Sequence, residues 1–333
     1  MPWQDVICHE TVREMIRRSS EKGMLRGTHL IFGPPGAGQR QIGLALAKTV
    51  QCPQIPNDFC DQCAVCQRID KKAFPDVIEL LPDEDWSDPE KKRKRRTYSI
   101  SHMRQVIAFA QQHPYEADAK VFVMHEAHRI EIEAANCLLK TLEEPAPHVQ
   151  FFLLTDNASA ILPTIDSRCR KIPLSPLDAS ELAARLTGTL APEQAETIAR
   201  AANGLPQQAE QLIEENYLEQ RDEIIERLAA VRKHESAMLE TVEWMSKDKE
   251  KLPLRLTILL NLFRDGLILT SHNRGPLRNP DQREALAQLW QNDTPDALMR
   301  DLEVTLDAQQ SLDRNVNAQA LLSTLWMQYR HVA

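Results

Sequence analysis

The sequence predicts an α/β fold with a parallel sheet in its first half and an all-helical second half. Up to about residue 174, short apolar runs alternate with helix-length amphipathic segments. This alternation is typical of a parallel sheet with helices on both faces. Beyond Pro173 the hydrophobic pattern is helical almost throughout, without strand-like alternation of polar and apolar residues. These two observations predict an α/β module followed by helical domains.

Four short, mainly apolar runs form the predicted strands. They are residues 28–32, 77–81, 121–124 and 151–155. The helix-length segments between them are residues 41–50, 101–112 and 131–144. The first strand leads through a stretch rich in glycine and proline into the first of these helices, so the sequence predicts a strand, a loop and a helix in that order.

The second half divides into shorter and longer predicted helices. The shorter helices are residues 180–186, 192–202 and 206–215, with Pro or Asp near their starts and Gly188 and Gly204 at their ends. The longer amphipathic segments include residues 221–231, 253–269, 280–291 and 318–329. We therefore expect three domains, at residues 1–174, 175–216 and 217–333.

The charge of the chain limits how it could bind nucleic acid. Its 333 residues include 40 basic and 48 acidic side chains, for a net charge of −8. This balance argues against a polycation that coats nucleic acid. Residues 91–96 are six consecutive cations, which suggest either a local contact with a DNA backbone or a solvated loop paired with nearby acids.

The sequence shows no sign of export or membrane insertion. The longest apolar stretch, residues 256–269, is interrupted by Asn261, Arg264, Asp265 and Gly266 and is too short for a membrane span. The first residues lack the basic region, apolar core and cleavage site of a secretory signal. We expect a cytoplasmic protein that has no membrane partner.

Residues 33–40, with the sequence GPPGAGQR, lie where a phosphate-binding loop would lie. Its glycines, which let backbone N–H groups turn inward around an anion, are Gly33, Gly36 and Gly38. The complete signature ends in Lys followed by Ser or Thr, which contact the phosphates and magnesium. Gln39 and Arg40 occupy these two positions. The sequence therefore predicts the shape of the loop without its chemistry.

The strand predicted at residues 121–124 ends in His125 and Glu126. In an active nucleotide site the corresponding strand ends in Asp, which holds magnesium, followed by Glu, which polarises the attacking water. A neutral imidazole is a poor ligand for magnesium, which prefers oxygen, and Glu126 then has no metal beside it. The loop at residues 33–40 and the strand end at His125 and Glu126 are both altered, and they follow one another in the order that a nucleotide site requires. Together they predict a degenerate site that does not hydrolyse ATP.

Four cysteines are clustered with the spacing C-x7-C-x2-C-x2-C. They are Cys52, Cys60, Cys63 and Cys66. Four thiolates complete a tetrahedral zinc shell and leave no open position for a catalytic water, so we expect a structural zinc site. An iron–sulfur cluster and free thiols are the alternatives.

These features, in this order, resemble the clamp-loader branch of the AAA+ ATPase-fold proteins. The most specific segments are residues 135–145 (ANCLLKTLEEP) and residues 162–169 (LPTIDSRC). The similarity extends over residues 1–215 and is weaker in the helical remainder, where residues 314–317 (RNVN) match best. The resemblance implies an AAA+ module with a zinc-binding segment at 52–66, then a small helical lid and a helical collar that joins a ring of related subunits.

The resemblance also implies a division of labour among subunits. Active subunits bind ATP, while one subunit keeps the fold, does not hydrolyse ATP, and presents an arginine to its neighbour's nucleotide. Arg168 matches that arginine, which would act in trans as an arginine finger; the alternative is an ordinary salt-bridged surface arginine. Gln207 replaces a nucleotide-sensing arginine, and Thr155 and Asn157 are expected to be structural. The implied partners are the tau and gamma ATPase subunits, a delta subunit, the sliding clamp and primed DNA.

Two other functions remain open at this stage. An active clamp-loader ATPase would require Gln39 and Arg40 to substitute for the missing groups. A stand-alone zinc-containing DNA-binding protein would require tight binding to DNA without partners, and the net charge of −8 argues against it. We therefore expect a stator, which is a subunit that does not hydrolyse ATP itself and supplies an arginine to its neighbour.

Overall fold

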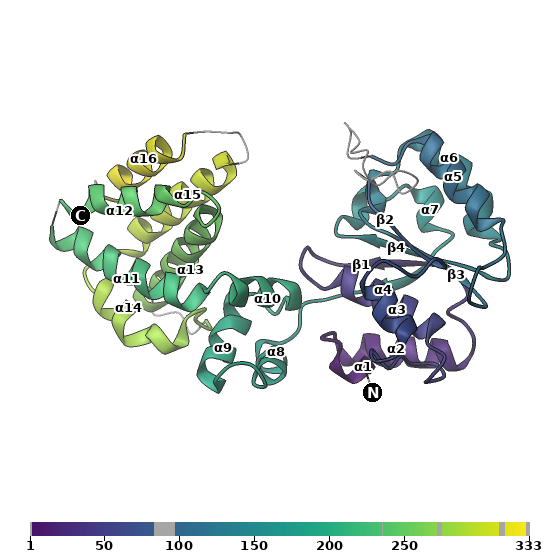
Figure 1. The fold of residues 1–333 in the computed structure, drawn as a ribbon. Helices are drawn as coiled ribbons and strands as arrows, with labels where there is room; N and C mark the ends of the chain where they lie inside the picture. The colour runs from purple at the N-terminus through teal and green to yellow at the C-terminus, as the bar shows by residue number, and fades with distance from the viewer. Residues whose placement is uncertain (1, 83–96, 235, 272–274, 313–316, 331–333) are drawn as a thin grey trace. The chain divides into compact units, whose positions relative to one another are not determined.

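The computed structural model describes residues 2–82, 97–234, 236–271, 275–312 and 317–330 (Figure 1). The chain forms two compact units, Met1–Leu177 and Asp178–Ala333. Unit 1 contains the sheet, and the described part of unit 2 contains helices and no strand. The predicted order of an α/β module followed by helices is confirmed.

A five-stranded parallel sheet with the strand order β2-β3-β4-β1-β5 forms the centre of unit 1. Its strands are β1 Gly27–Phe32, β2 Val77–Leu80, β3 Lys120–Met124, β4 Val149–Thr155 and β5 Arg170–Pro173. The four predicted strands are present. The sequence pattern missed β5, an edge strand in which only Ile172 is buried while Arg170 and Lys171 are exposed.

Helices cover both faces of this sheet. They are α1 Pro2–Asp5, α2 Glu10–Glu21, α3 Gln39–Gln51, α4 Ala64–Asp70, α5 Ile100–Ala110, α6 Ile132–Glu143 and α7 Pro163–Asp166. Phe122 and Phe151 stack with ring centroids 4.8 Å apart and pack in one core with residues of α5 and α6. On the opposite face, α3 approaches the sheet at Gly43, where an added Cβ would lie 2.9 Å from Leu154 Cδ2 (Figure 1). This close approach holds the start of α3 against the strand ends.

Unit 2 is helical throughout its described residues. Its helices are α8 Ala179–Leu186, α9 Pro192–Ala201, α10 Pro206–Glu214, α11 Tyr217–Lys233, α12 Ala237–Lys247, α13 Leu252–Thr270, α14 Arg283–Leu289, α15 Pro295–Leu312 and α16 Ala318–Arg330. The helix predicted at residues 280–291 begins instead as the 3-10 turn η3 Pro280–Gln282, which precedes α14. No helix in the described parts of the chain has the length and apolar character needed to cross a membrane.

A buried polar contact joins the shorter helices of unit 2 to the longer ones. Asp281 Oδ1 accepts hydrogen bonds from Thr197 Oγ1 of α9 at 2.9 Å and from Arg221 Nη1 of α11 at 2.8 Å. The Arg221 side chain is only 3% exposed, so its buried charge is balanced by the carboxylates of Asp281 and Asp222. The division of this unit into a lid and a collar at residue 216 stays a prediction.

Candidate functional site

The glycine-rich loop lies between β1 and α3, as the sequence predicts. Gly36 and Gly38 have φ angles of 84° and 90°, in the left-handed region that favours glycine. A Cβ added to Gly33 would lie 2.5 Å from the carbonyl oxygen of Leu174, so only glycine fits there. The backbone therefore retains the turn of a phosphate-binding loop at the start of a helix.

The side chain of Gln39 hydrogen-bonds to the backbone of this loop. Its Nε2 donates hydrogen bonds to the carbonyl oxygens of Gly33 at 2.9 Å and Pro34 at 2.8 Å. The residue is 8% exposed, so its amide is committed to the loop's own backbone. A neutral amide in this position supplies no charge for a nucleotide phosphate.

Arg40 points to a buried carboxylate. Its Nε lies 3.0 Å from Glu79 Oε1, and His125 Nε2 lies 2.8 Å from the same oxygen. Lys72 Nζ lies 3.3 Å from the other oxygen, Oε2. The Glu79 side chain is 6% exposed. The two positions where an active site would bind magnesium, Arg40 and His125, are thus joined to each other through Glu79.

The electrostatics of Glu79 follow from these contacts. Burial alone would raise the pKa of this carboxyl, but the contacts with His125 and Arg40 outweigh burial and lower it from 4.5 to about 2. Glu79 is therefore ionised and paired at neutral pH. Because Arg40 and Lys72 are cations, the arrangement opposes a divalent metal ion at this place.

The other polar residues near the strand ends stabilise the local backbone. Glu126 has a φ of 45° and pairs with Arg129. Thr155 Oγ1 accepts a hydrogen bond from the Asn157 backbone N–H at 3.0 Å and lies 2.9 Å from His128 Nδ1. The structural role expected for Thr155 and Asn157 stays a prediction. In unit 2, Gln207 lies exposed in the first turn of α10.

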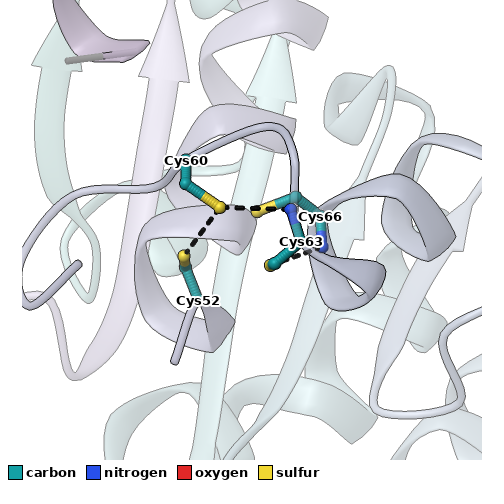
Figure 2. A group of neighbouring side chains, drawn as sticks. All are labelled: Cys52, Cys60, Cys63 and Cys66. Carbon is teal, nitrogen blue, oxygen red and sulfur yellow. Dashed lines mark hydrogen bonds between the residues drawn. The ribbon is translucent and has the colours of Figure 1, made fainter. Parts of the chain in front are cut away.

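The four cysteines come together at the end of α3 and the start of α4 (Figure 2). The sulfur atoms of Cys52, Cys60, Cys63 and Cys66 all lie within 4.8 Å of one another. Cys52 Sγ and Cys60 Sγ are 3.8 Å apart, close to the separation of about 3.8 Å that a tetrahedral shell with zinc–sulfur bonds of about 2.3 Å produces.

Backbone donors around these thiols also suit a metal site. The N–H of Cys63 lies 3.2 Å from Cys60 Sγ, and the N–H of Cys66 lies 3.4 Å from Cys63 Sγ. Hydrogen bonds from the backbone of Cys63 and Gln62 lower the pKa of Cys60 to about 7, whereas burial raises the pKa of Cys66. Donor set, separation and backbone support therefore fit a closed four-sulfur metal centre.

Arg168 lies at the surface of unit 1, directly after α7. This helix begins at Pro163 and is anchored by the buried Ile165. Arg168 Nε donates to Glu143 Oε2 at 3.0 Å, and Nη1 donates to the carbonyl oxygen of Thr164 at 3.0 Å. The Arg168 side chain remains 30% exposed. The end of α6 and the turn of α7 together orient the guanidinium.

The structure brings together only some of the predicted site residues. Arg40 and His125 meet at Glu79, Gln39 bonds to the backbone of the loop, and the cysteines form a separate cluster. Sequence reasoning missed Glu79 and Glu143. A charged residue inside the apolar run of β2 is the signal that could have revealed Glu79. The cationic run at residues 91–96 and residues 314–316 of the C-terminal match lie outside the described residues.

A five-stranded parallel sheet with a glycine-rich loop leading from β1 into α3, followed by a helical unit, is the fold of the AAA+ class of proteins. The family described as DNA polymerase III, delta subunit, matches residues 8–178, and its C-terminal family matches residues 215–331. The chain therefore belongs to the delta prime family of DNA polymerase III clamp-loader subunits.

Individual relatives agree with this family. The delta prime subunit of Bacillus subtilis is 27% identical over 323 residues, which cover 94% of each chain. That of Haemophilus influenzae is 27% identical over 298 residues, or 86% of each chain. The tau subunit of B. subtilis is 30% identical over 210 residues, which cover 61% of this chain and 35% of tau.

Two solved structures align with this chain over most of its length. A gamma subunit-related protein of Thermotoga maritima is 20% identical and superposes with a TM-score of 0.41, covering 96% of this chain and 98% of its own. The clamp-loader delta protein of B. subtilis is 13% identical with a TM-score of 0.39, covering 95% of this chain and 98% of its own.

Glu79→Gln is expected to destabilise unit 1 in a pH-dependent way. The folded pKa of about 2 lies below the ordinary 4.5, so the ionised carboxylate stabilises the fold above pH 4.5 and this contribution is lost as the pH falls toward 2. This difference in pKa corresponds to about 3 kcal/mol in the free energy of unfolding at neutral pH. Hydrogen exchange of the β3 amides in the full chain at pH 7 and at pH 3.5 measures it.

The matched control is Glu116→Gln, which removes the carboxylate of an exposed ion pair with Arg68. Its effect should stay below about 1 kcal/mol. Equal protection in the Glu79 and Glu116 variants at pH 7 would contradict the importance of the buried network.

Proposed function

We propose that this chain is the non-hydrolysing stator of a clamp loader and supplies Arg168 to the nucleotide site of a neighbouring ATPase subunit. The observation that carries this proposal is the internal pairing of Arg40 and His125 through Glu79. It occupies the positions where a working site needs ligands for magnesium. The chain binds no functional magnesium nucleotide, and its contribution to catalysis is made in trans.

Arg168 is suited to this role by its donors and its exposure. A guanidinium has five N–H donors, and the contacts with Glu143 and Thr164 engage Nε and Nη1. An exposed ion pair contributes about 0–1 kcal/mol, so an incoming phosphate can replace Glu143 at little cost. Against a neighbour's nucleotide, the guanidinium would stabilise the negative charge that develops on the transferred γ-phosphoryl group.

The four-cysteine cluster is proposed to hold a structural zinc ion. Cys52, Cys60, Cys63 and Cys66 would provide all four ligands, which leaves no position for a catalytic water. Zinc supplies folding stability in such a closed site, because its ligands are brought together only in the folded chain. ATP chemistry in this chain is not expected to involve this metal.

The family relation supports a set of partners. These would be the tau and gamma ATPase subunits, the delta subunit, the sliding clamp reached through the complex, and primed DNA. Residues 217–333 would form the collar that joins the ring, residues 175–216 the lid, and residues 1–174 the AAA+ module. The expected place of action is the cytoplasm, where the complex would load the clamp onto primed DNA during replication.

ATP hydrolysis by the reconstituted partner complex tests the arginine-finger role. The wild-type chain should stimulate ATP hydrolysis by the complex. The Arg168→Ala chain should assemble with the complex but fail to stimulate hydrolysis, because arginine fingers contribute about 10³–10⁵ to kcat at the site they serve. Arg168→Lys should restore little of this activity, since an ammonium lacks the planar fork of donors. The isolated chain should be inert.

Arg104→Ala is the matched control, because Arg104 is another exposed arginine of unit 1. It should behave as wild type. Magnesium-dependent turnover by the isolated chain would identify an active ATPase instead, and full stimulation by the Arg168→Ala complex would refute the donated arginine.

Zinc removal tests the metal proposal. We expect one zinc per chain, and its chelation should cost at least about 3 kcal/mol, or about 6–12 °C in the melting temperature of a unit of this size. Metal analysis and thermal unfolding with and without a chelator measure this. Cys63→Ser should lose the zinc, whereas Cys137→Ser, outside the cluster, should keep it. An unchanged melting curve, or the visible absorption of an iron–sulfur cluster, would contradict the assignment.

A further inference from the structure

Lys48 is a buried cation that the nucleotide loop does not use. It lies in the last turn of α3 and is 8% exposed. Its Nζ lies 2.5 Å from Asp61 Oδ1 and 2.7 Å from Asp70 Oδ1. The same Nζ lies 5.5 Å from the ring centroid of Phe59. The Lys48 side chain is 10% exposed, whereas the carboxylates of Asp61 and Asp70 are 48% and 50% exposed, so the ammonium lies beneath two half-exposed acids.

Its two acids belong to the segments that carry the cysteines. Asp61 directly follows Cys60 and adopts a left-handed φ of 56°. Asp70 is the last residue of α4, the helix that is capped by Cys63 and contains Cys66. This single ammonium therefore contacts both the loop and the helix that bring three of the four thiols to the cluster.

The fourth thiol is tied to Lys48 through the backbone. Cys52 caps the end of α3, and its N–H donates to the carbonyl oxygen of Lys48 at 2.8 Å. Lys48 thus contacts the Cys60 loop and α4 through its ammonium and Cys52 through its carbonyl oxygen. It supplies no ligand to the metal.

We propose that Lys48 is a positioning residue for the metal centre. It holds the Cys60 loop and α4 against the end of α3, so that the four sulfur atoms are close enough for one ion before the ion binds. This inference rests on the proposed zinc site. Partners that orient metal ligands in this way are commonly worth about 10–100-fold in metal affinity.

The end of α3 and the cysteine-bearing segment at residues 52–66 (the insert) also hold the N-terminal segment of the chain. Trp3 Nε1 donates to Thr49 Oγ1 at 2.7 Å, and the Trp3 backbone N–H lies 3.4 Å from Asp58 Oδ1. The Trp3 ring packs edge-on against Phe59, with centroids 5.7 Å apart. Loosening the insert should therefore speed hydrogen exchange at the Trp3 amide of α1, which gives a second readout close to the metal centre.

Zinc affinity and release in the full chain test this role. Competition with a metallochromic chelator should show about 10–100-fold weaker zinc binding in Lys48→Met than in wild type, with correspondingly faster release. Lys48→Arg, which retains the charge, should lie closer to wild type. The matched control is Lys71→Met, because Lys71 is an exposed lysine at the end of α4 and should bind zinc as wild type does.

Further variants keep the test informative if Lys48→Met does not fold. Asp61→Asn and Asp70→Asn each remove one partner of the ammonium and should each weaken zinc binding, with faster hydrogen exchange at the Trp3 amide of α1. A merely structural role for Lys48 would lower the melting temperature equally with and without zinc and leave the zinc affinity unchanged.

The outcomes separate this inference from the zinc proposal. Wild-type zinc affinity in a folded Lys48→Met chain would overturn the positioning role and leave the zinc site standing. Absence of zinc from the wild-type chain would overturn both. Weaker binding in Lys48→Met, Asp61→Asn and Asp70→Asn, but not in Lys71→Met, is the result that supports it.

Discussion

The buried carboxylate of Glu79 is the constraint on which the chemistry of this module depends. In a working nucleotide site of this class, a magnesium cation lies between the loop and the next strand end, and oxygen ligands from both segments hold it. Here the signs of charge are reversed, because an anion lies between Arg40 from the loop side and His125 from the strand end. Glu79 thereby connects the loop side and the strand end through its contacts with Arg40 and His125.

Helix α3 links the two specialised regions of unit 1. It begins at the closed loop with Gln39 and ends beside the cysteine cluster with Lys48 and Cys52. Its middle packs closely on the sheet at Gly43. Arg168 follows α7, and its guanidinium is held by Glu143 of α6 and by the carbonyl oxygen of Thr164.

Sequence patterns predicted the features that depend on neighbours along the chain. Four strands, the glycine loop and the cysteine cluster are local in this sense, and each is present in the structure. The edge strand β5 was missed because only Ile172 of its four residues is buried. Glu79, Glu143 and Lys48 were missed because their partners are distant in sequence: Glu79 and Arg40 are brought together only by the parallel sheet. Such pairings follow from the folded topology and leave no periodic signal.

The most direct measurement is a cryo-electron microscopy structure of the reconstituted clamp loader, containing this chain, with ADP and a mimic of the transferred phosphoryl group. The account predicts that the guanidinium of Arg168 contacts the mimic in the neighbouring subunit at about 2.7–2.9 Å. It also predicts that the loop at residues 33–40 holds no nucleotide and that Arg40 remains on Glu79. Magnesium nucleotide in that loop with Glu79 displaced, or Arg168 paired with Glu143 and distant from every nucleotide, would contradict the account.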